Sequence, residues 1–236
     1  MNKTKKLVIF GTGEIGRMAH FYFTHDSDYE VVAFTADDEF VTDNTYLGLP
    51  LLPFSRIKQH YPPNLYEMHV GLSFMRLNQT RAEKYYLAKK AGYTLASYVC
   101  SKSAYWPDLT IGDNCFILEN QTIQPTVKIG SNVMLWSGNH LGHGSIIRDH
   151  VYFASHICMS GFCDIGERTF IGVNATLRDF CKVGSDCFIT MDTSVVTDVP
   201  SGSVVLADRA KVLTADDPVA QKIKNKYFFA TQPVHA

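Results

Sequence analysis

The sequence lacks a surplus of charge of either sign, because 22 lysine and arginine residues stand against 23 aspartate and glutamate residues. A surface that binds nucleic acid or an anionic membrane usually carries a basic excess. The sequence also lacks a long apolar run: the one that follows the basic start, residues 7–10, is too short for a signal peptide or a membrane span. We therefore predict a cytoplasmic protein that binds a small molecule, with no nucleic acid or membrane as partner.

Nothing in the sequence indicates a disulfide framework. Six cysteines in a chain of 236 residues without an export signal are expected to be reduced thiols. The length is enough for one large domain or two modest ones, and we predict two.

The first half begins with a pattern of strand, glycine turn and helix. Residues 6–10 predict a buried parallel strand, which runs into G-T-G-E-I-G at residues 11–16 and an apolar helix from residue 18. Gly11 and Gly13 would let backbone N–H groups and the positive end of the helix dipole approach a phosphate. The alternative is that these glycines only allow close packing of strand and helix.

An acidic loop follows the second predicted strand, residues 29–34. Its carboxylates, Asp37 and Asp38, suit a ribose hydroxyl or a base edge, although a solvated loop would also explain them. Up to residue 95 only one more strand (69–74) and one helix (76–91) are clear. We therefore predict an α/β Rossmann-like domain over residues 1–95, sized for one nucleotide rather than for a dinucleotide.

The second half repeats with a period of six residues. Stepping by six from residue 111 to residue 195 meets an apolar side chain every time, and a mostly small residue stands four positions after each. This pattern predicts a parallel β-helix in which each hexad is a short strand plus a corner, three hexads make a coil of about 18 residues, and equivalent residues stack. Four cysteines fall at the small position and are interpreted as buried fillers, namely Cys115, Cys163, Cys181 and Cys187.

Histidines are unusual on such a repeat, and two lie close together in W-S-G-N-H-L-G-H-G-S, residues 136–145. An imidazole can remove a proton at neutral pH while an amine or hydroxyl attacks a thioester, so His143 is the candidate base and His140 a second candidate. Gly161 follows His143 by one coil. Its N–H can stabilise the developing negative charge, and its missing side chain leaves room for a pantetheine arm. His150 and His156 are expected to lie on solvated faces or to line the groove.

Taken together, the turn GTGEIG, the loop TADDE, the hexads and the motifs NHLGHGS and FIGVNATLRD resemble bacterial nucleotide-sugar acyltransferases over residues 5–213. The group includes sialic acid O-acetyltransferases and bacillosamine N-acetyltransferases. The resemblance implies a left-handed β-helix of hexapeptide repeats, acetyl-CoA or another acyl-CoA as co-substrate without a metal, and a homotrimer with active sites at subunit interfaces.

For individual residues, the resemblance implies that His143 is catalytic, that Gly161 is the oxyanion donor beside acyl-CoA, and that Val173 lines the coenzyme A groove. Some relatives carry a glutamate directly after the histidine, where this chain has Gly144, so the acidic partner of His143 is unassigned. We predict the β-helix over residues 96–213 and a tail over residues 214–236, with a helix at residues 215–226.

The predicted function is transfer of an acetyl or longer acyl group from acyl-CoA to an amino or hydroxyl group of a nucleotide-linked sugar, in the biosynthesis of a surface glycan such as lipopolysaccharide O-antigen. Three alternatives stay open. A zinc enzyme of the β-helix carbonic anhydrase kind would use the four histidines of residues 140–156, but their spacing scatters them around the coil. A nucleotide-sensing trimer would need no catalysis, and a dinucleotide oxidoreductase would need a second half-domain.

Overall fold

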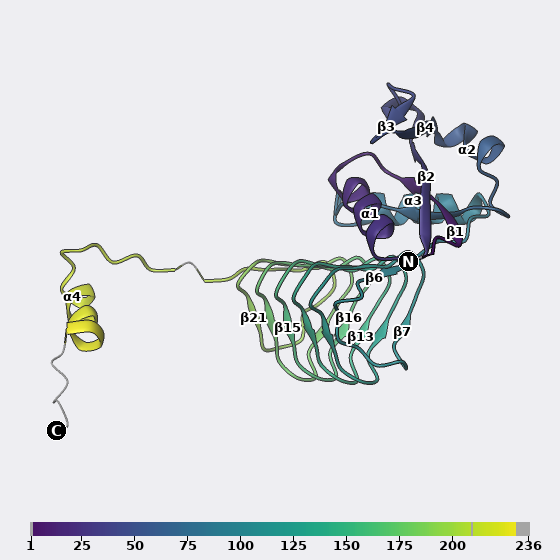
Figure 1. The fold of residues 1–236 in the computed structure, drawn as a ribbon. Coiled ribbons are helices and arrows are strands. Elements are labelled where there is room, and N and C mark those ends of the chain that lie inside the picture. Colours follow the sequence, from purple (N-terminus) through teal and green to yellow (C-terminus); the bar gives the residue numbers. More distant parts are fainter. Residues whose placement is uncertain (1, 209, 230–236) are drawn as a thin grey trace.

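A computed structural model describes residues 2–208 and 210–229 of the chain. It has an open sheet with three helices at the N-terminal end, followed by a prism of stacked coils and a C-terminal arm (Figure 1). The N-terminal elements are β1 (Lys5–Phe10), α1 (Glu14–His25), β2 (Tyr29–Ala36), the 3-10 turn η1 (Asp38–Phe40), β3 (Thr45–Tyr46), β4 (Leu49–Pro53), α2 (Phe54–His60), β5 (Glu67–Val70) and α3 (Gln79–Lys90).

The N-terminal sheet has the strand order β3-β4-β2-β1-β5, and its last four strands are parallel. The parallel order β4-β2-β1-β5 corresponds to the first four strands, 3-2-1-4, of the doubly wound strand order 3-2-1-4-5-6. The predicted strands at residues 6–10 and 29–34 are present, and the third lies slightly earlier than predicted, at Glu67–Val70. The prediction missed β4 and α2. Pro50 and Pro53 interrupt the apolar pattern there, and proline normally argues against a strand inside a sheet.

The coils confirm the hexad pattern over its whole length. Each of the fifteen apolar positions from residue 111 to residue 195 is the second residue of a two-residue strand. The strands are β6 (Tyr98–Val99), β7 (Thr110–Ile111), β8 (Phe116–Ile117), β9 (Thr122–Ile123), β10 (Lys128–Ile129), β11 (Met134–Leu135), β12 (His140–Leu141), β13 (Ile146–Ile147), β14 (Tyr152–Phe153), β15 (Cys158–Met159), β16 (Asp164–Ile165), β17 (Phe170–Ile171), β18 (Thr176–Leu177), β19 (Lys182–Val183), β20 (Phe188–Ile189), β21 (Ser194–Val195) and β22 (Val204–Val205).

These strands form three parallel sheets that make the faces of the prism, an arrangement that fits a left-handed β-helix. Face 1 contains β6, β8, β11, β14, β17, β20 and β22; face 2 contains β9, β12, β15, β18 and β21; face 3 contains β7, β10, β13, β16 and β19. The second residue of each strand points inward and forms a continuous apolar core, which also holds the four cysteines at the small positions. Their interpretation as buried fillers is confirmed.

Three corners join the faces, and each turns through residues with a positive φ angle. We name them by those stacked residues: corner 1 is Asn114, Asn132, His150, Arg168 and Asp186; corner 2 is Asn120, Gly138, His156, Asn174 and Asp192; corner 3 is Thr126, Gly144, Phe162 and Phe180. Along the chain, corner 1 leads into face 1, corner 2 into face 2 and corner 3 into face 3. Corner 3 is therefore the edge opposite face 1.

The N-terminal sheet is held against face 1 and corner 1. On face 1, α1 contributes Tyr22 and Phe23 to an aromatic cluster with Tyr98 and Phe116. On corner 1, the buried guanidinium of Arg81 from α3 donates hydrogen bonds to the carbonyl oxygens of successive coils, those of Asn132 and His150. Asn78 Nδ2 donates to the carbonyl oxygen of Arg168, one coil further, at 2.9 Å. Corner 3 is left on the far side of the prism.

His150 is not on a solvated face or in a groove, as the sequence predicted, but fully buried. Its Nδ1 is 2.8 Å from Asn132 Nδ2 and its Nε2 is 3.0 Å from the hydroxyl of Tyr86 on α3. The prediction was wrong because the hexad period marks corners as exposed, whereas α3 covers this one. Burial lowers the pKa of His150 to about 4.

We expect stability to fall as the pH drops from about 6.5 to about 4. His69, a buried residue of β5, has its pKa lowered to about 4 as well, again chiefly by burial. Both imidazoles are neutral when folded, and the unfolded chain binds their protons near pH 6.5, so each adds a slope of about 1.4 kcal/mol per pH unit in this window. Urea unfolding of His150→Gln and wild type between pH 7 and pH 4.5 measures this. If the free energy of unfolding changed with pH by the same amount in both proteins, the lowered pKa of His150 would be contradicted.

The C-terminal arm leads away from the last coil (Figure 1). Its helix α4 (Pro218–Lys224) begins at Asp217, whose side chain accepts a hydrogen bond from Val219 N at 2.8 Å, and runs into the π-helical turn η2 (Asn225–Phe229). The predicted helix at residues 215–226 is thus present but shorter, and the end of the predicted tail, residues 230–236, lies outside the described residues. Among the helices described, none has the length and apolar character needed to cross a membrane.

Candidate functional site

A pocket of about 280 Å³ lies at the carboxyl ends of β1 and β5. Gly13 from the turn before α1, residues 71–73 after β5, and Thr80 at the start of α3 line it. In the strand order, β1 is the point from which the connections run in opposite directions, and open α/β sheets bind their ligands in the crevice at such a point. The pocket is therefore the candidate nucleotide site.

Packing within the fold requires some of the glycines in the turn before α1 but not all of them. A side chain on Gly11, whose φ is +121°, would place its Cβ 2.6 Å from the carbonyl oxygen of Gly71, and one on Gly16 would collide with the carbonyl oxygen of Gly11. Packing alone therefore explains Gly11 and Gly16. Gly13 has an extended backbone with φ of −81°, and nothing lies within 4 Å of the position of a Cβ. The fold does not require glycine at 13, whereas close approach of a ligand to the N-terminus of α1 would be helped by it.

The two predicted acidic ligands also differ. Asp38 accepts hydrogen bonds from Ser55 N at 3.2 Å and Ser55 Oγ at 2.5 Å, and these bonds lower its pKa. Asp38 thus serves the start of α2. Asp37 forms a partly buried ion pair with Lys84 Nζ at 2.7 Å. Lys84 lies one helical turn after Thr80, which lines the pocket, although neither Asp37 nor Lys84 lines it. The pair could not be predicted from the sequence because its partners are 47 positions apart.

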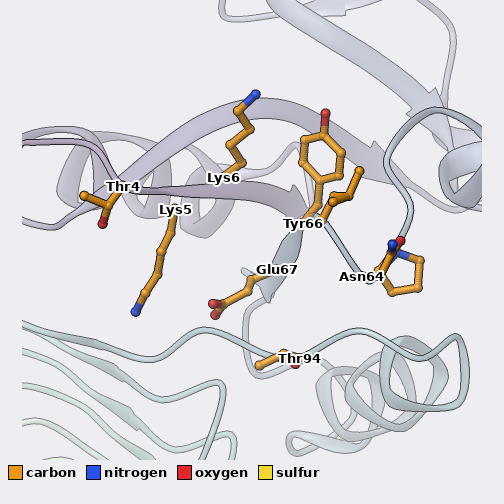
Figure 2. A pocket seen from close by; sticks show the side chains of 9 residues that line it. Thr4, Lys5, Lys6, Asn64, Tyr66, Glu67 and Thr94 are labelled. Carbon is orange, nitrogen blue, oxygen red and sulfur yellow. The ribbon is translucent and has the colours of Figure 1, made fainter.

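A hollow of about 500 Å³ lies at the opposite, amino end of the same sheet. Figure 2 shows Lys6 and Tyr66 pointing to one side of β1 and Lys5 and Glu67 to the other. Within the protein, Glu67 accepts a hydrogen bond from the Tyr29 hydroxyl at 2.5 Å and Lys5 pairs with Asp28 at 3.5 Å. Since its polar groups diverge and these two are already paired, we do not assign it a ligand.

Corner 3 brings His143 and Gly161 together, as their spacing of one coil predicted. The His143 side chain is exposed, and its ring packs edge-on against Phe162 with centroids 4.9 Å apart. A Cβ on Gly161 would be 2.9 Å from His143 Cε1 and 3.0 Å from Nε2. Only glycine at 161 therefore leaves the imidazole in place and its Nε2 accessible.

The predicted oxyanion donor already has a partner within the chain. Gly161 N donates a hydrogen bond to Asp179 Oδ1, one coil further along the corner, at 2.9 Å. A thioester carbonyl that used this N–H would have to take the place of the Asp179 carboxylate. Because Asp179 is exposed, its side chain can rotate into water when it is displaced.

The other predicted residues lie on different parts of the prism. His140 is half-buried on face 2, where it pairs in register with Thr122 and Cys158. Val173 and His156 are exposed at corner 2. Within one chain, face 2 therefore separates His143 from Val173, and the width of the prism separates His143 from the nucleotide pocket. Across the described part of the chain, no three side chains of histidine, cysteine, aspartate or glutamate gather closely enough to hold a metal ion.

One residue of this corner was missed by the sequence analysis. Gln124, on the preceding coil, contacts both the backbone and the ring of His143 through its side-chain oxygen. Its position in the repeat could have identified it, because Gln124 directly precedes residue 125, which stacks one coil before His143.

No family model matches the sequence. The fold is shared with solved acetyltransferases. The acetyltransferase domain of PglB from Neisseria gonorrhoeae FA1090 has a TM-score of 0.76 at 22% identity, covering 89% of this chain and 100% of that one. A structure of the same domain with acetyl coenzyme A gives 0.77 at 23% identity, covering 90% and 100%. PerB from Caulobacter crescentus, solved with CoA and GDP-perosamine, gives 0.76 at 19% identity, covering 89% and 97%.

Curated relatives match over a shorter stretch. An acyl-(acyl-carrier-protein)–UDP-N-acetylglucosamine O-acyltransferase from Stutzerimonas stutzeri is 28% identical over 110 residues, which is 44% of this chain and 43% of the relative. The enzyme of that name from Aliarcobacter butzleri is 30% identical over 100 residues, or 39% and 38%. The chain thus spans less than half the length of these relatives. The resemblance to hexapeptide-repeat acyltransferases is confirmed, and for the solved neighbours it is the fold that is shared.

Proposed function

We propose that this protein transfers an acetyl or longer acyl group from acyl-CoA to an amino or hydroxyl group of a nucleotide-linked sugar, in surface glycan biosynthesis in the cytoplasm. The observation that carries the proposal is an exposed imidazole packed against a glycine, with His143 Nε2 3.0 Å from the position that a Cβ on Gly161 would take. Solved neighbours with the same fold bind acetyl coenzyme A in one case and CoA with GDP-perosamine in another.

In the proposed mechanism, His143 starts as neutral imidazole. Its Nε2 accepts the proton of the sugar hydroxyl or neutral amine while the oxygen or nitrogen forms a bond to the thioester carbonyl carbon. The carbonyl oxygen becomes an anion, which the N–H of Gly161 stabilises after leaving Asp179. Collapse of this intermediate breaks the carbon–sulfur bond, and the imidazolium returns its proton to the leaving CoA thiolate.

We propose that the complete site forms between copies of the chain, as a homotrimer. The N-terminal sheet covers face 1 and corner 1, whereas His143 lies at corner 3, so a sugar held in the nucleotide pocket of one chain is turned away from its own base. A neighbouring copy with its corner 3 toward that pocket would supply the base. In the same arrangement acyl-CoA would run between corner 3 of one copy and corner 2 of the next, where Val173 is exposed.

Within each chain, we assign nucleotide-sugar binding to residues 1–95, with Gly13 and the Asp37–Lys84 pair in contact with the nucleotide. Acyl transfer falls to residues 96–213, and residues 214–236 form the tail. His140, three residues before the base, would contact the acceptor sugar from face 2.

Release of free CoA thiol tests the function directly. Purified protein is incubated with acetyl- and longer acyl-CoA and a panel of UDP-, GDP- and dTDP-linked amino sugars. We expect thiol release with at least one combination that is well above hydrolysis without sugar, together with an acylated sugar nucleotide by mass spectrometry. Thiol release from none of the combinations would overturn the proposal.

Gly13→Asp is expected to weaken nucleotide-sugar binding without weakening the fold. A carboxylate at the N-terminus of α1 repels the diphosphate, and a loss of about 1.4 kcal/mol or more raises the KM for the sugar nucleotide at least about tenfold. Stability should be unchanged or higher by a few tenths of a kcal/mol, because Gly13 is the N-cap without a side-chain cap and aspartate is a better one. Gly13→Asn, a neutral cap of the same size, is the matched control. An equal KM for the two variants would argue against a phosphate at this pocket.

A further inference from the structure

The side-chain oxygen of Gln124 accepts two hydrogen bonds from His143, one from the backbone N–H at 2.8 Å and one from ring Nδ1 at 3.0 Å. A backbone N–H can only donate, so the atom of the Gln124 amide that faces it must be the oxygen. Because the same oxygen faces Nδ1, that ring nitrogen must carry a hydrogen. The lone pair of the neutral imidazole is then on Nε2.

This tautomer directs the basic nitrogen to the place where the proposed chemistry needs it. Nε2 lies 3.0 Å from the position that a Cβ on Gly161 would take, and Nδ1 is the ring nitrogen that faces Gln124 on the preceding coil. The adjacent backbone is held in the same way, since Gly144 N donates to Thr126 Oγ1 at 3.0 Å. Residues 124 and 126 of one coil thus fix residues 143 and 144 of the next.

The acceptor on Nδ1 is uncharged. The residues in contact with this corner, namely Gln124 and Thr126 on the coil before and Gly161 and Phe162 on the coil after, do not titrate. The carboxylate that touches this set is Asp179, through Gly161 N–H. A carboxylate on Nδ1 would stabilise the imidazolium and delay release of the base to higher pH, whereas an amide oxygen orients the ring without doing so.

We propose that Gln124 is a positioning residue for the transferase reaction: it holds His143 in the Nδ1–H tautomer through a neutral acceptor and takes the place of the acidic partner that the sequence leaves unassigned. The inference rests on the proposed function of His143 as a base. It also makes a statement about the resting protein that is independent of turnover, the position of one hydrogen.

Two substitutions of Gln124, each similar in size to glutamine, distinguish the effect of orienting the His143 ring from the effect of adding a charge beside it. Gln124→Met removes the acceptor and should lower kcat about 10- to 100-fold, while the KM for both substrates stays within about twofold. Gln124→Glu keeps the acceptor, so its kcat at high pH should stay near that of wild type. Its carboxylate should move the acidic limb of the kcat/KM profile upward by about one pH unit, because the imidazolium gains a charged partner. Gln59→Glu, on the exposed side of α2, is the matched control for an added charge and should leave the limb in place.

The tautomer itself is read from the ring nitrogen shifts of 15N-labelled histidine in wild type and in Gln124→Met, with His143→Asn used for assignment. We expect Nδ1–H in wild type and a mixture in Gln124→Met. Nε2–H in wild type, or an acidic limb in Gln124→Glu at the wild-type pH, would overturn the role of Gln124. An active protein in which His143→Asn loses nothing would instead overturn the proposed base and leave the tautomer result standing.

Discussion

Replacing His143 with asparagine is expected to lower kcat for acyl transfer about 10²- to 10⁴-fold, the range that a positioned general base contributes. Asparagine can still hydrogen-bond but cannot accept the proton at neutral pH. The side chain is exposed at corner 3, so the free energy of unfolding should change by less than about 0.5 kcal/mol. Thiol release at saturating substrates measures the activity, and urea unfolding checks the fold.

His60→Asn is the control for this experiment. His60 is also exposed, but it is the last residue of α2 and lies neither in the nucleotide pocket nor at corners 2 and 3. It should retain activity within about twofold. If His143→Asn transferred acyl groups as fast as wild type, catalysis would not depend on this histidine. If neither variant nor wild type released thiol while nucleotide still bound, the non-catalytic sensor would be favoured.

The β-helix was predictable from the sequence because its stacking constraint is local and repeated. A large apolar residue must fill the interior once per hexad, so the positions of fifteen strands followed from a single period. The same period placed Gly161 beside His143, since residues one coil apart stack. A regular repeat thus predicts backbone neighbours well.

The hexad period does not predict which corner of the β-helix is buried by the N-terminal elements. Which of three equivalent corners is buried depends on contacts between distant parts of the chain, such as Arg81 of α3 with the carbonyl oxygen of His150. For this reason the prediction that His150 lies on a solvated face or in the groove was wrong, whereas His140 and His156 do lie on the surface. In the N-terminal sheet, Pro50 and Pro53 hid β4, which lies next to the two-residue edge strand β3.

The hydrogen bonds between side chains and backbone at the site could not be predicted from the sequence either. The period predicted that Gly161 follows His143, but it could not show that Asp179 binds the N–H of Gly161 or that Gln124 reaches across a coil. These pairings depend on rotamers rather than on register. They also change the chemistry most, because one occupies the proposed oxyanion donor and the other fixes the tautomer of the base.

Two variants that each lose most of the activity should recover part of it when they assemble together. His143→Asn lacks the base, and Gly13→Asp, assayed at a sugar-nucleotide concentration well below its KM, lacks the bound acceptor. If the nucleotide pocket of one chain serves His143 of its neighbour, random assembly of an equal mixture leaves about one quarter of the interfaces with both intact parts, and so about one quarter of wild-type activity. Co-expression or refolding of mixed chains, followed by thiol release, measures this.

The matching experiment distinguishes sites between chains from sites within one chain. Wild type is mixed equally with the double variant that carries both substitutions. Sites within a chain would keep about one half of the activity, because every wild-type chain remains complete. Sites between chains would keep about one quarter, because half of the intact pockets would then face a chain without His143. Since the N-terminal sheet of each chain covers face 1 and corner 1, away from corner 3, we expect one quarter in both mixtures. If the mixture of the two single variants showed only background activity and the mixture of wild type with the double variant kept one half, the whole reaction would take place within a single chain.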